Sequence, residues 1–109
     1  MAGSGETYVR KDSKFAFRAK SSNGQVVATG QGYTARSSAT STLTKLLAGD
    51  YKNYEVYERK SGDWAFRFTA GNGQIVATDG GQGYAAKASA ENTASNLAAG
   101  KYNGEITSL

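Results

Sequence analysis

The sequence predicts an α+β fold in which a unit of about fifty residues occurs twice. Residues 6–29 match residues 55–78 at 13 of 24 positions, and residues 30–51 match residues 81–102 at 12 of 22. In each copy the apolar pattern changes from the alternation of strands to the spacing of a helix. A chain of 109 residues suits one compact domain. We therefore expect both copies to build one antiparallel sheet, with two helices on one face and a pseudo-two-fold axis between them.

Three strands are expected to open each copy. The middle strands, residues 15–20 and 64–69, alternate strictly, and Trp64, Phe66 and Phe68 share one face. Each runs into an Asn-Gly pair, which favours a two-residue type I′ hairpin turn because both residues tolerate positive φ. The returning strands are residues 26–29 and 75–78, and the first strands are residues 7–11 and 54–59.

A helix is expected after the glycine-rich loop of each copy. The two apolar stripes have helical spacing and consist of Ala35, Ala39, Leu43 and Leu46 in one copy and Ala86, Ala90, Ala94 and Leu97 in the other. Gly49 and Gly100 suit left-handed C-terminal caps, and Thr34 can cap the first helix. A last strand is expected at residues 104–107. The predicted core contains Phe15, Phe17, Val26, Leu43, Leu46, Trp64, Phe66, Phe68, Ile75 and Leu97.

The expected boundaries follow from the repeat. Residues 1–5 lack the apolar segment of a signal peptide and suggest a flexible leader. Repeat 1 spans residues 6–53 and repeat 2 spans residues 54–109, both within one compact domain. No apolar run approaches membrane-spanning length, so we expect a cytoplasmic protein without membrane contact. A monomer is expected because the duplication supplies its own pseudo-dimer.

Composition makes catalysis an unfavourable hypothesis. The chain has no cysteine and no histidine, which excludes thiolate chemistry, imidazole bases and the usual metal sites built on them. Among the acidic residues, only Glu6 and Glu55 occupy equivalent positions in both copies, and no paired carboxylates with catalytic spacing recur. We therefore predict no catalytic residue, no metal and no cofactor.

Several of these motifs resemble the YegP-like family of small bacterial and archaeal proteins, a domain of unknown function. They are residues 54–57 (Tyr-Glu-Val-Tyr), residues 64–67 (Trp-Ala-Phe-Arg), the Asn-Gly-Gln turns, the Gly-Tyr before each helix, and residues 87–92. Repeat 1 departs from this pattern where Thr40-Ser41 replaces Glu-Asn. The resemblance implies a β-β-β-α-β unit whose final strands are exchanged between repeats, here near residues 51–55 and 102–107. It implies no activity.

The glycine-rich turns and the tyrosines that follow them allow two interpretations. Backbone N–H groups in such a turn can hold a phosphate at a helix N-terminus. However, no Gly-Lys-Ser/Thr follows, so the glycines are better explained by sharp reversal of the chain. Tyr33 and Tyr84 precede the helices in equivalent positions. They either fill the junction of sheet and helix or stack on a ligand.

The face of the sheet opposite the helices carries the main candidate binding residues. Strand parity places basic and tyrosine side chains there, namely Tyr8, Arg10, Arg18, Lys20, Tyr57, Arg59 and Arg67. Arginine and tyrosine on an antiparallel sheet can bind single-stranded nucleic acid by pairing phosphates and stacking bases. Alternatively, the same residues cover a solvent-facing sheet and pair across its strands.

Charge does not decide among the functions. The net charge is +4, with eight basic and three acidic residues in positions 1–53 and five basic and six acidic residues in positions 54–109. The first hypothesis is a non-enzymatic small binding or structural module that acts through contacts with an unknown protein partner. The alternative is single-stranded nucleic-acid binding on the Arg/Tyr face, and an enzyme using carboxylates or tyrosines ranks third.

Overall fold

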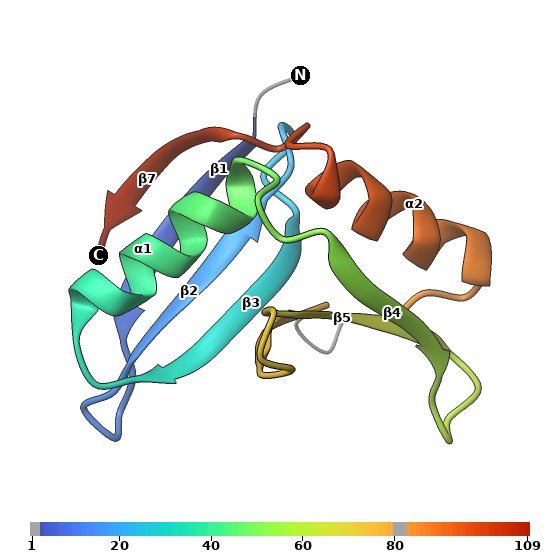
Figure 1. Cartoon of the computed structure of the whole chain (residues 1–109), viewed down its shortest axis with the longest axis horizontal. Helices are drawn as coiled ribbons and strands as arrows, with labels where there is room; N and C mark the ends of the chain where they lie inside the picture. Colours follow the sequence, from blue (N-terminus) through green and yellow to red (C-terminus); the bar gives the residue numbers. More distant parts are fainter. Residues whose placement is uncertain (1–2, 80–82) are drawn as a thin grey trace.

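One mixed sheet covered by two helices on the same side makes up the fold (Figure 1). The computed structural model describes residues 3–79 and 83–109. Along the described chain the elements are β1 (Gly3–Val9), β2 (Phe15–Lys20), β3 (Val26–Tyr33), α1 (Arg36–Leu47), β4 (Asn53–Glu58), β5 (Trp64–Thr69), β6 (Ile75–Thr78), α2 (Lys87–Ala98) and β7 (Gly104–Ser108). This order confirms the predicted duplication of three strands and a helix.

The strand order is β4-β5-β6-β3-β2-β1-β7. Each repeat contributes an antiparallel three-stranded meander, and the pairing of β3 with β6 joins the two meanders into one sheet. After α2 the chain crosses to the other half and β7 pairs with β1 in parallel. The sheet is therefore antiparallel with one parallel pair, because β7 reaches β1 through a helix crossover rather than a hairpin.

The strand that follows each helix lies in the half built by the other repeat. Thus α1 is followed by β4, which pairs with β5, whereas α2 is followed by β7, which pairs with β1. By repeat alignment β4 corresponds both to β1 and to β7, since it ends repeat 1 and begins repeat 2. Among the described residues, the half containing repeat 1 consequently has four strands, and the half containing repeat 2 has three.

The hairpin turns differ from the predicted type I′ form. At the β2–β3 turn the Gly24 N–H donates to Ser21 O and the Ser21 N–H donates to Gln25 O, both at 2.9 Å. Gly24 and Gly73 have positive φ, but Asn23 and Asn72 do not. Each loop is therefore a three-residue turn that ends in a left-handed glycine, because the extra residue forms a bulge.

That bulge also explains an error in the predicted core. The register shifts between Ala19 and Lys20 in one hairpin and between Phe68 and Thr69 in the other. As a result Val27 is buried, whereas Val26 is half-buried outside the core cluster and Ile75 is 56% exposed. Trp64, also predicted in the core, is half-buried with the Lys87 ammonium 5.7 Å from its ring centre.

The remaining core predictions are confirmed. Phe17, Phe66 and Phe68 are fully buried under the helices, and Phe15 packs against the same cluster while half-exposed. The helices contribute Ala39, Leu43, Leu46 and Leu47 from α1, and Ala90, Ala94 and Leu97 from α2. Gly49 and Gly100 have the positive φ expected of C-terminal caps, but the N-cap of α1 is Ala35, without a side-chain bond, rather than Thr34.

The first strand begins earlier than the sequence indicated. Gly3, Ser4 and Gly5, assigned to the leader of residues 1–5, lie in β1, where all three pair with β7 and the last two also pair with β2. Residues 1–2 lie outside the described part of the chain. Pairing on both edges satisfies the backbone of this glycine-rich segment, which explains why a composition typical of linkers is ordered here.

Candidate functional site

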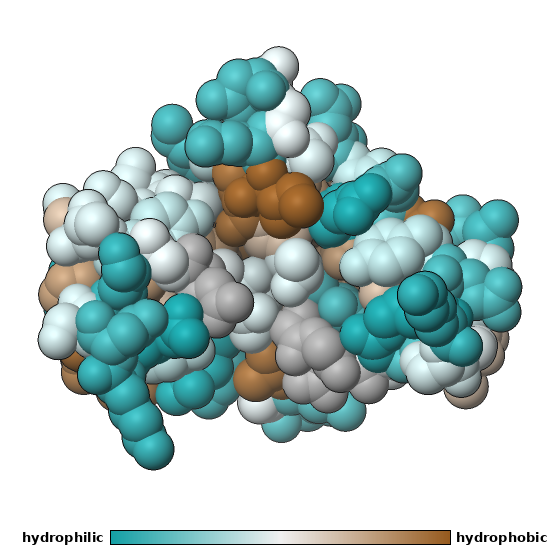
Figure 2. Space-filling model, turned by 90° about the horizontal axis from the view of Figure 1, so that it is seen from below, coloured by the Kyte–Doolittle hydropathy of each residue, from teal (hydrophilic) through white to brown (hydrophobic). Residues whose placement is uncertain are grey.

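The open face of the sheet, away from α1 and α2, carries most of the predicted binding residues. Gly5 lies under Leu43 of α1 and so marks the helix-covered face of β1. Because successive side chains of a strand alternate between the two faces, Glu6 and Tyr8 point to the open face. Arg18 pairs with Glu6 in register and belongs to the same face. Viewed from that side, the surface is mostly hydrophilic with a small hydrophobic area near its centre (Figure 2).

In repeat 1 the open face holds one ion-paired cluster. Glu6 Oε1 accepts a short hydrogen bond from Arg18 Nε and lies 3.2 Å from Lys20 Nζ. The Arg18 guanidinium also lies over the Tyr8 ring, 4.6 Å from its centre. The hydrogen bond from Arg18 is the main cause that holds the pKa of Glu6 below its ordinary value, against partial desolvation.

Repeat 2 builds the same cluster from equivalent residues. Arg67 Nε donates to Glu55 Oε1 at 2.6 Å, and the guanidinium lies 5.0 Å from the centre of the Tyr57 ring. Thr69 stands where repeat 1 has Lys20, so this cluster has no second cation among its aligned positions. Arg18 and Arg67 are therefore each held by a glutamate and a tyrosine on the neighbouring strand.

The two clusters lie in one row across the sheet. Arg18 is opposite Thr29, Thr29 is opposite Thr78, and Thr78 is opposite Arg67. Glu6 and Glu55 complete the row at its two ends. Neighbouring strands are about 4.8 Å apart, so the backbones of the two arginines are separated by about 14 Å.

Arg10 and Arg59 belong to hairpin turns rather than to this row. The Arg10 guanidinium is 3.8 Å from Asp12, and that of Arg59 forms a short ion pair with Asp63. The bond from Arg59, assisted by Ser61, holds the pKa of Asp63 far below its usual range. These two arginines brace the turns that precede β2 and β5.

Tyr33 and Tyr84 lie on the helix side of the sheet. Their rings pack against Phe17 and Phe66, at centre-to-centre distances of 5.9 and 6.1 Å. Burial raises the pKa of both phenols, and hydrogen bonds with Thr42 and Thr93 oppose this shift. The structure therefore separates these tyrosines from the Arg/Tyr face and places each of them against the core.

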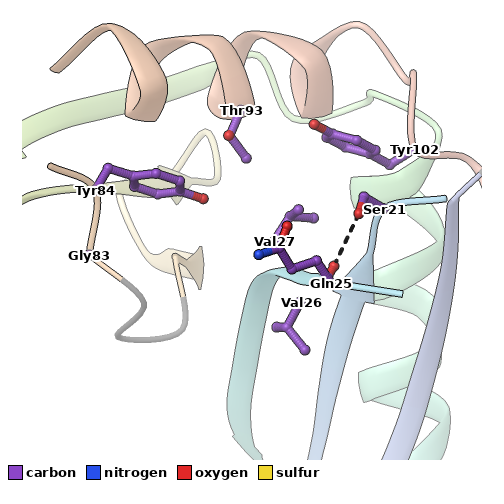
Figure 3. A pocket seen from close by; sticks show the side chains of 8 residues that line it. All are labelled: Ser21, Gln25, Val26, Val27, Gly83, Tyr84, Thr93 and Tyr102. Carbon is purple, nitrogen blue, oxygen red and sulfur yellow. Dashed lines mark hydrogen bonds between the residues drawn. The ribbon is translucent and has the colours of Figure 1, made fainter. Parts of the chain in front are cut away.

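A hollow of about 330 Å³ lies beside Tyr84, between the β2–β3 turn and α2 (Figure 3). Its described lining consists of Ser21, Gln25, Val26, Val27, Gly83, Tyr84, Thr93 and Tyr102. The hydroxyls of Tyr84 and Tyr102 point into the same space from opposite sides (Figure 3). Sequence reasoning singled out Tyr84 but missed Thr93 and Tyr102, although Thr42 and Tyr51 repeat them in the first copy.

The outer edge of β4 is the third candidate site. Among the described residues, β1 is paired on one side with β2 and on the other with β7, whereas β4 is paired only with β5. Asn53, Tyr54 and Glu55 are exposed. A row of backbone N–H and C=O groups without a strand partner can receive an extended chain.

Within residues 3–79 and 83–109, no group of three or more acidic, histidine or cysteine side chains is arranged to hold a metal ion. No helix in that part of the chain is long and apolar enough to cross a membrane.

Comparisons with known proteins identify relatives of unknown function. The model of a domain of unknown function, DUF1508, matches residues 10–42 and 60–95, one segment in each repeat. The solution structure of the protein of unknown function yegP from E. coli is similar with 26% identity and a TM-score of 0.83 over 99% of this chain and 93% of that one. The solution structure of UPF0339 protein SO3888 from Shewanella oneidensis has 25% identity and a TM-score of 0.84 over 100% and 92%. No curated protein matches the sequence significantly.

Proposed function

This chain belongs to the DUF1508 family, a YegP-like family of unknown function, and we propose that it is a non-enzymatic module that binds an extended segment of a partner protein along β4. The observation that supports this proposal is the difference between two equivalent strands. In the described chain β1 carries β7 on its outer edge, and β4 carries no strand there. Addition of a strand to an open sheet edge is a common mode of peptide recognition.

The free groups of the β4 edge follow from the hairpin. The Arg59 N–H donates to Asp63 O, so Arg59 directs its backbone toward β5. Alternation along an antiparallel pair then turns Tyr57 and Glu55 toward β5 as well. Tyr54, Val56 and Glu58 consequently direct their N–H and C=O groups outward.

The chain itself contains an example of this mode of binding. β7 runs parallel to β1, the Gly3 N–H donates to Asn103 O at 3.2 Å, and the Leu109 N–H donates to Thr7 O at 2.8 Å. Gly5 and Thr7 correspond to Tyr54 and Val56 in the repeat. An incoming strand parallel to β4 would meet the same backbone pattern that β1 presents to β7.

Differences between the two edges indicate the chemistry of the partner segment. β7 places the half-buried Ile106 opposite Gly5, whereas the equivalent position in β4 is the larger Tyr54. A small residue therefore fits opposite Tyr54. Arg36 Nη2 binds Leu109 O at 2.8 Å, and Lys87 takes the place of Arg36 in repeat 2. Lys87 offers its ammonium to a carbonyl or carboxylate of the added segment.

A peptide-display selection tests this proposal. Peptides of about twelve residues, long enough to span β4, are selected against the intact protein and measured by fluorescence anisotropy. Glu58→Pro removes an outward N–H but none that bonds β5, so selected peptides should bind this variant at least about tenfold more weakly. Val9→Pro changes the equivalent position of β1 and is the matched control. Selected peptides that bind both variants as tightly as the wild type would refute the proposal.

Single-stranded nucleic-acid binding is the second candidate, and the row of Arg18, Thr29, Thr78 and Arg67 favours it. Two Arg–Tyr stacks on one face resemble the stacking surfaces of single-strand binders. The engagement of both arginines by glutamates counts against it, because phosphates would have to displace Glu6 and Glu55. Anisotropy with labelled single-stranded RNA and DNA at two salt concentrations tests this candidate, with Arg18→Ala/Arg67→Ala as the variant. Binding that is unchanged in the double variant would exclude this face.

A further inference from the structure

The hollow between the two repeats has the lining of a small-molecule site. It is bounded by the β2–β3 turn of repeat 1 and by α2 with its flanking residues from repeat 2 (Figure 3). Its volume of about 330 Å³ is at the lower end of the range for ligand pockets in proteins. The residues that line this hollow are separate from the outward groups of the β4 edge. They are also separate from the row of Arg18, Thr29, Thr78 and Arg67 on the open face, called here the Arg–Thr row.

The described lining contains hydroxyl and amide groups but no charged side chain. Ser21, Thr93, Tyr84 and Tyr102 each supply a hydroxyl, and Gln25 supplies an amide. A hydroxyl both donates and accepts hydrogen bonds, so this set matches a ligand whose own groups do both. A phosphate, carboxylate or ammonium group would lose hydration there without gaining an opposite charge from the described lining.

Several of these polar groups are oriented by neighbours. Asn96 Nδ2 donates to the Tyr102 hydroxyl at 3.4 Å, and the Thr93 hydroxyl donates to Ser89 O at 3.1 Å. The Tyr84 ring is stacked against Phe66, and the backbone of Tyr84 pairs with Trp64 through hydrogen bonds of 2.7 and 2.8 Å. Tyr84 therefore presents its hydroxyl from a fixed position, and little reorganisation is needed on binding.

A second hollow, of about 450 Å³, adjoins the first and shares Ser21 and Tyr102 with it. It is lined by Ser22, Asn23, Asn96 and Lys101 in addition to these two residues. Tyr102 thus stands between two polar depressions along the junction of the repeats. Together they extend the hydroxyl- and amide-rich surface beyond the size of a single small ring.

We propose that this junction binds a neutral, polyhydroxylated molecule of the size of a mono- or disaccharide. The ring of the sugar would lie in the hollow beside Tyr84, with its hydroxyls bonded to Ser21, Thr93 and Tyr102. An aromatic side chain provides the apolar body and polar tip that a sugar, with its apolar ring face and polar rim, can contact. The adjoining hollow would receive a second unit.

Titration of the ¹⁵N-labelled protein, followed by amide chemical shifts, tests the proposal. The probes are glucose, galactose, mannose and maltose, with glucose 6-phosphate and glucuronic acid as charged analogues. At least one neutral sugar should shift the amides of Ser21, Tyr84, Thr93 and Tyr102 in a saturable manner. The charged analogues should bind at least about tenfold more weakly because the described lining of the hollow beside Tyr84, which receives a single sugar unit, offers them no counter-charge. Lys101 lines only the adjoining hollow.

Two variants locate the binding. Tyr84→Phe and Thr93→Val remove one hydroxyl each while conserving shape, and each should weaken the sugar about five- to tenfold with the amide spectrum otherwise preserved. Tyr33→Phe removes the equivalent hydroxyl of repeat 1 and should leave the shifts at this hollow unchanged. Absence of saturable shifts with every neutral sugar, or equal binding of the charged analogues, would overturn the proposal. These outcomes are independent of peptide binding at β4.

Discussion

Thr29 of β3 lies directly opposite Thr78 of β6, and the two residues are equivalent positions of the repeat. Residues that pair with their own counterpart lie on the axis relating the two copies. The Arg–Thr row therefore extends symmetrically from this point, and the pairing explains how one duplicated sequence produces one continuous sheet. The symmetry of the sheet ends at its two edges, because β7 pairs with β1 at one edge and the described chain places no strand beside β4 at the other.

Glu6, at one end of the Arg–Thr row, predicts a pH dependence of the stability of the fold. The pKa of Glu6 is lower in the folded chain than its ordinary value of 4.5, mainly through the hydrogen bond from Arg18. A carboxyl with a depressed folded pKa stabilises the protein above its unfolded pKa, and this contribution is lost as the pH falls through the folded pKa. In Arg18→Met the Glu6 titration midpoint, measured by carboxyl ¹³C NMR, should move upward. An unchanged midpoint would show that Arg18 does not set this pKa.

Because Gly5 packs under α1, we predict that position 5 does not tolerate a larger side chain. A Cβ on Gly5 would lie 2.7 Å from Leu43 Cδ2 and 3.1 Å from Leu47 Cδ1. Gly5→Ala should therefore reduce the free energy of unfolding by about 1–3 kcal/mol through overpacking. Repeat 2 has Tyr54 and Ala94 at the equivalent positions, so the large and small residues are interchanged.

A double-mutant cycle in urea separates this contact from general effects. In the Leu43→Ala background, the methyl group added by Gly5→Ala has space. The loss in free energy of unfolding that Gly5→Ala causes should therefore be smaller there, by at least about 1 kcal/mol, than in the wild-type background. Additive effects of the two substitutions would contradict a direct contact between these side chains.

Backbone strain in the β1–β2 turn predicts a stabilising substitution. Ser13 has φ of 66°, and its counterpart in repeat 2 is Gly62 with φ of 90°. Ser13→Gly should increase the free energy of unfolding by about 0.5–1 kcal/mol, since glycine adopts the left-handed region without the steric cost of a Cβ. Thermal unfolding measures the change. The reciprocal Gly62→Ser should destabilise, and a stability gain there would contradict the argument from φ.

Arg36 predicts how strongly β7 is attached. Its guanidinium donates to Thr7 Oγ1 at 3.1 Å and to Leu109 O at 2.8 Å, and it lies 5.1 Å from the centre of the Phe15 ring. Arg36→Ala should destabilise the fold by about 1–3 kcal/mol and increase amide exchange at the end of β7. Lys45→Ala, on the same helix with an exposed side chain, is the control. Equal exchange in both variants would mean that Arg36 does not anchor β7.

The periodicity of apolar residues predicted the strands and helices well. It could not predict where a bulge changes which strand residues face the core. The two Asn-Gly pairs marked the hairpins correctly, yet glycine occupies the third position of a longer loop, and Ile75 turns outward. The choice between a two- and a three-residue loop depends on strand twist and on contacts made after folding. The parallel pairing of β7 with β1 likewise depends on the crossover from α2, which short-range patterns do not contain.

The candidate sites were predictable to different degrees. Parity alone placed Arg18, Arg67 and their tyrosines on one face, but the pairing of Glu6 and Glu55 with these arginines required the strand register. The one indication of this pairing in the sequence was that Glu6 and Glu55 occupy equivalent positions of the two repeats. Tyr102 and Thr93 line the hollow beside Tyr84 together with residues of the β2–β3 turn in the other repeat, and such a meeting of two repeats cannot be derived from the pattern of one repeat.

Amide hydrogen exchange along β4 is the most direct test of the proposed function. In the free protein the outward N–H groups of Tyr54, Val56 and Glu58 should exchange rapidly, whereas that of Thr7, the counterpart of Val56 in β1, should be protected by β7. A saturating peptide from the display selection should protect the three β4 amides and leave Thr7 unchanged. Slow exchange of these amides in the free protein, or no added protection with the peptide bound, would contradict strand addition at β4.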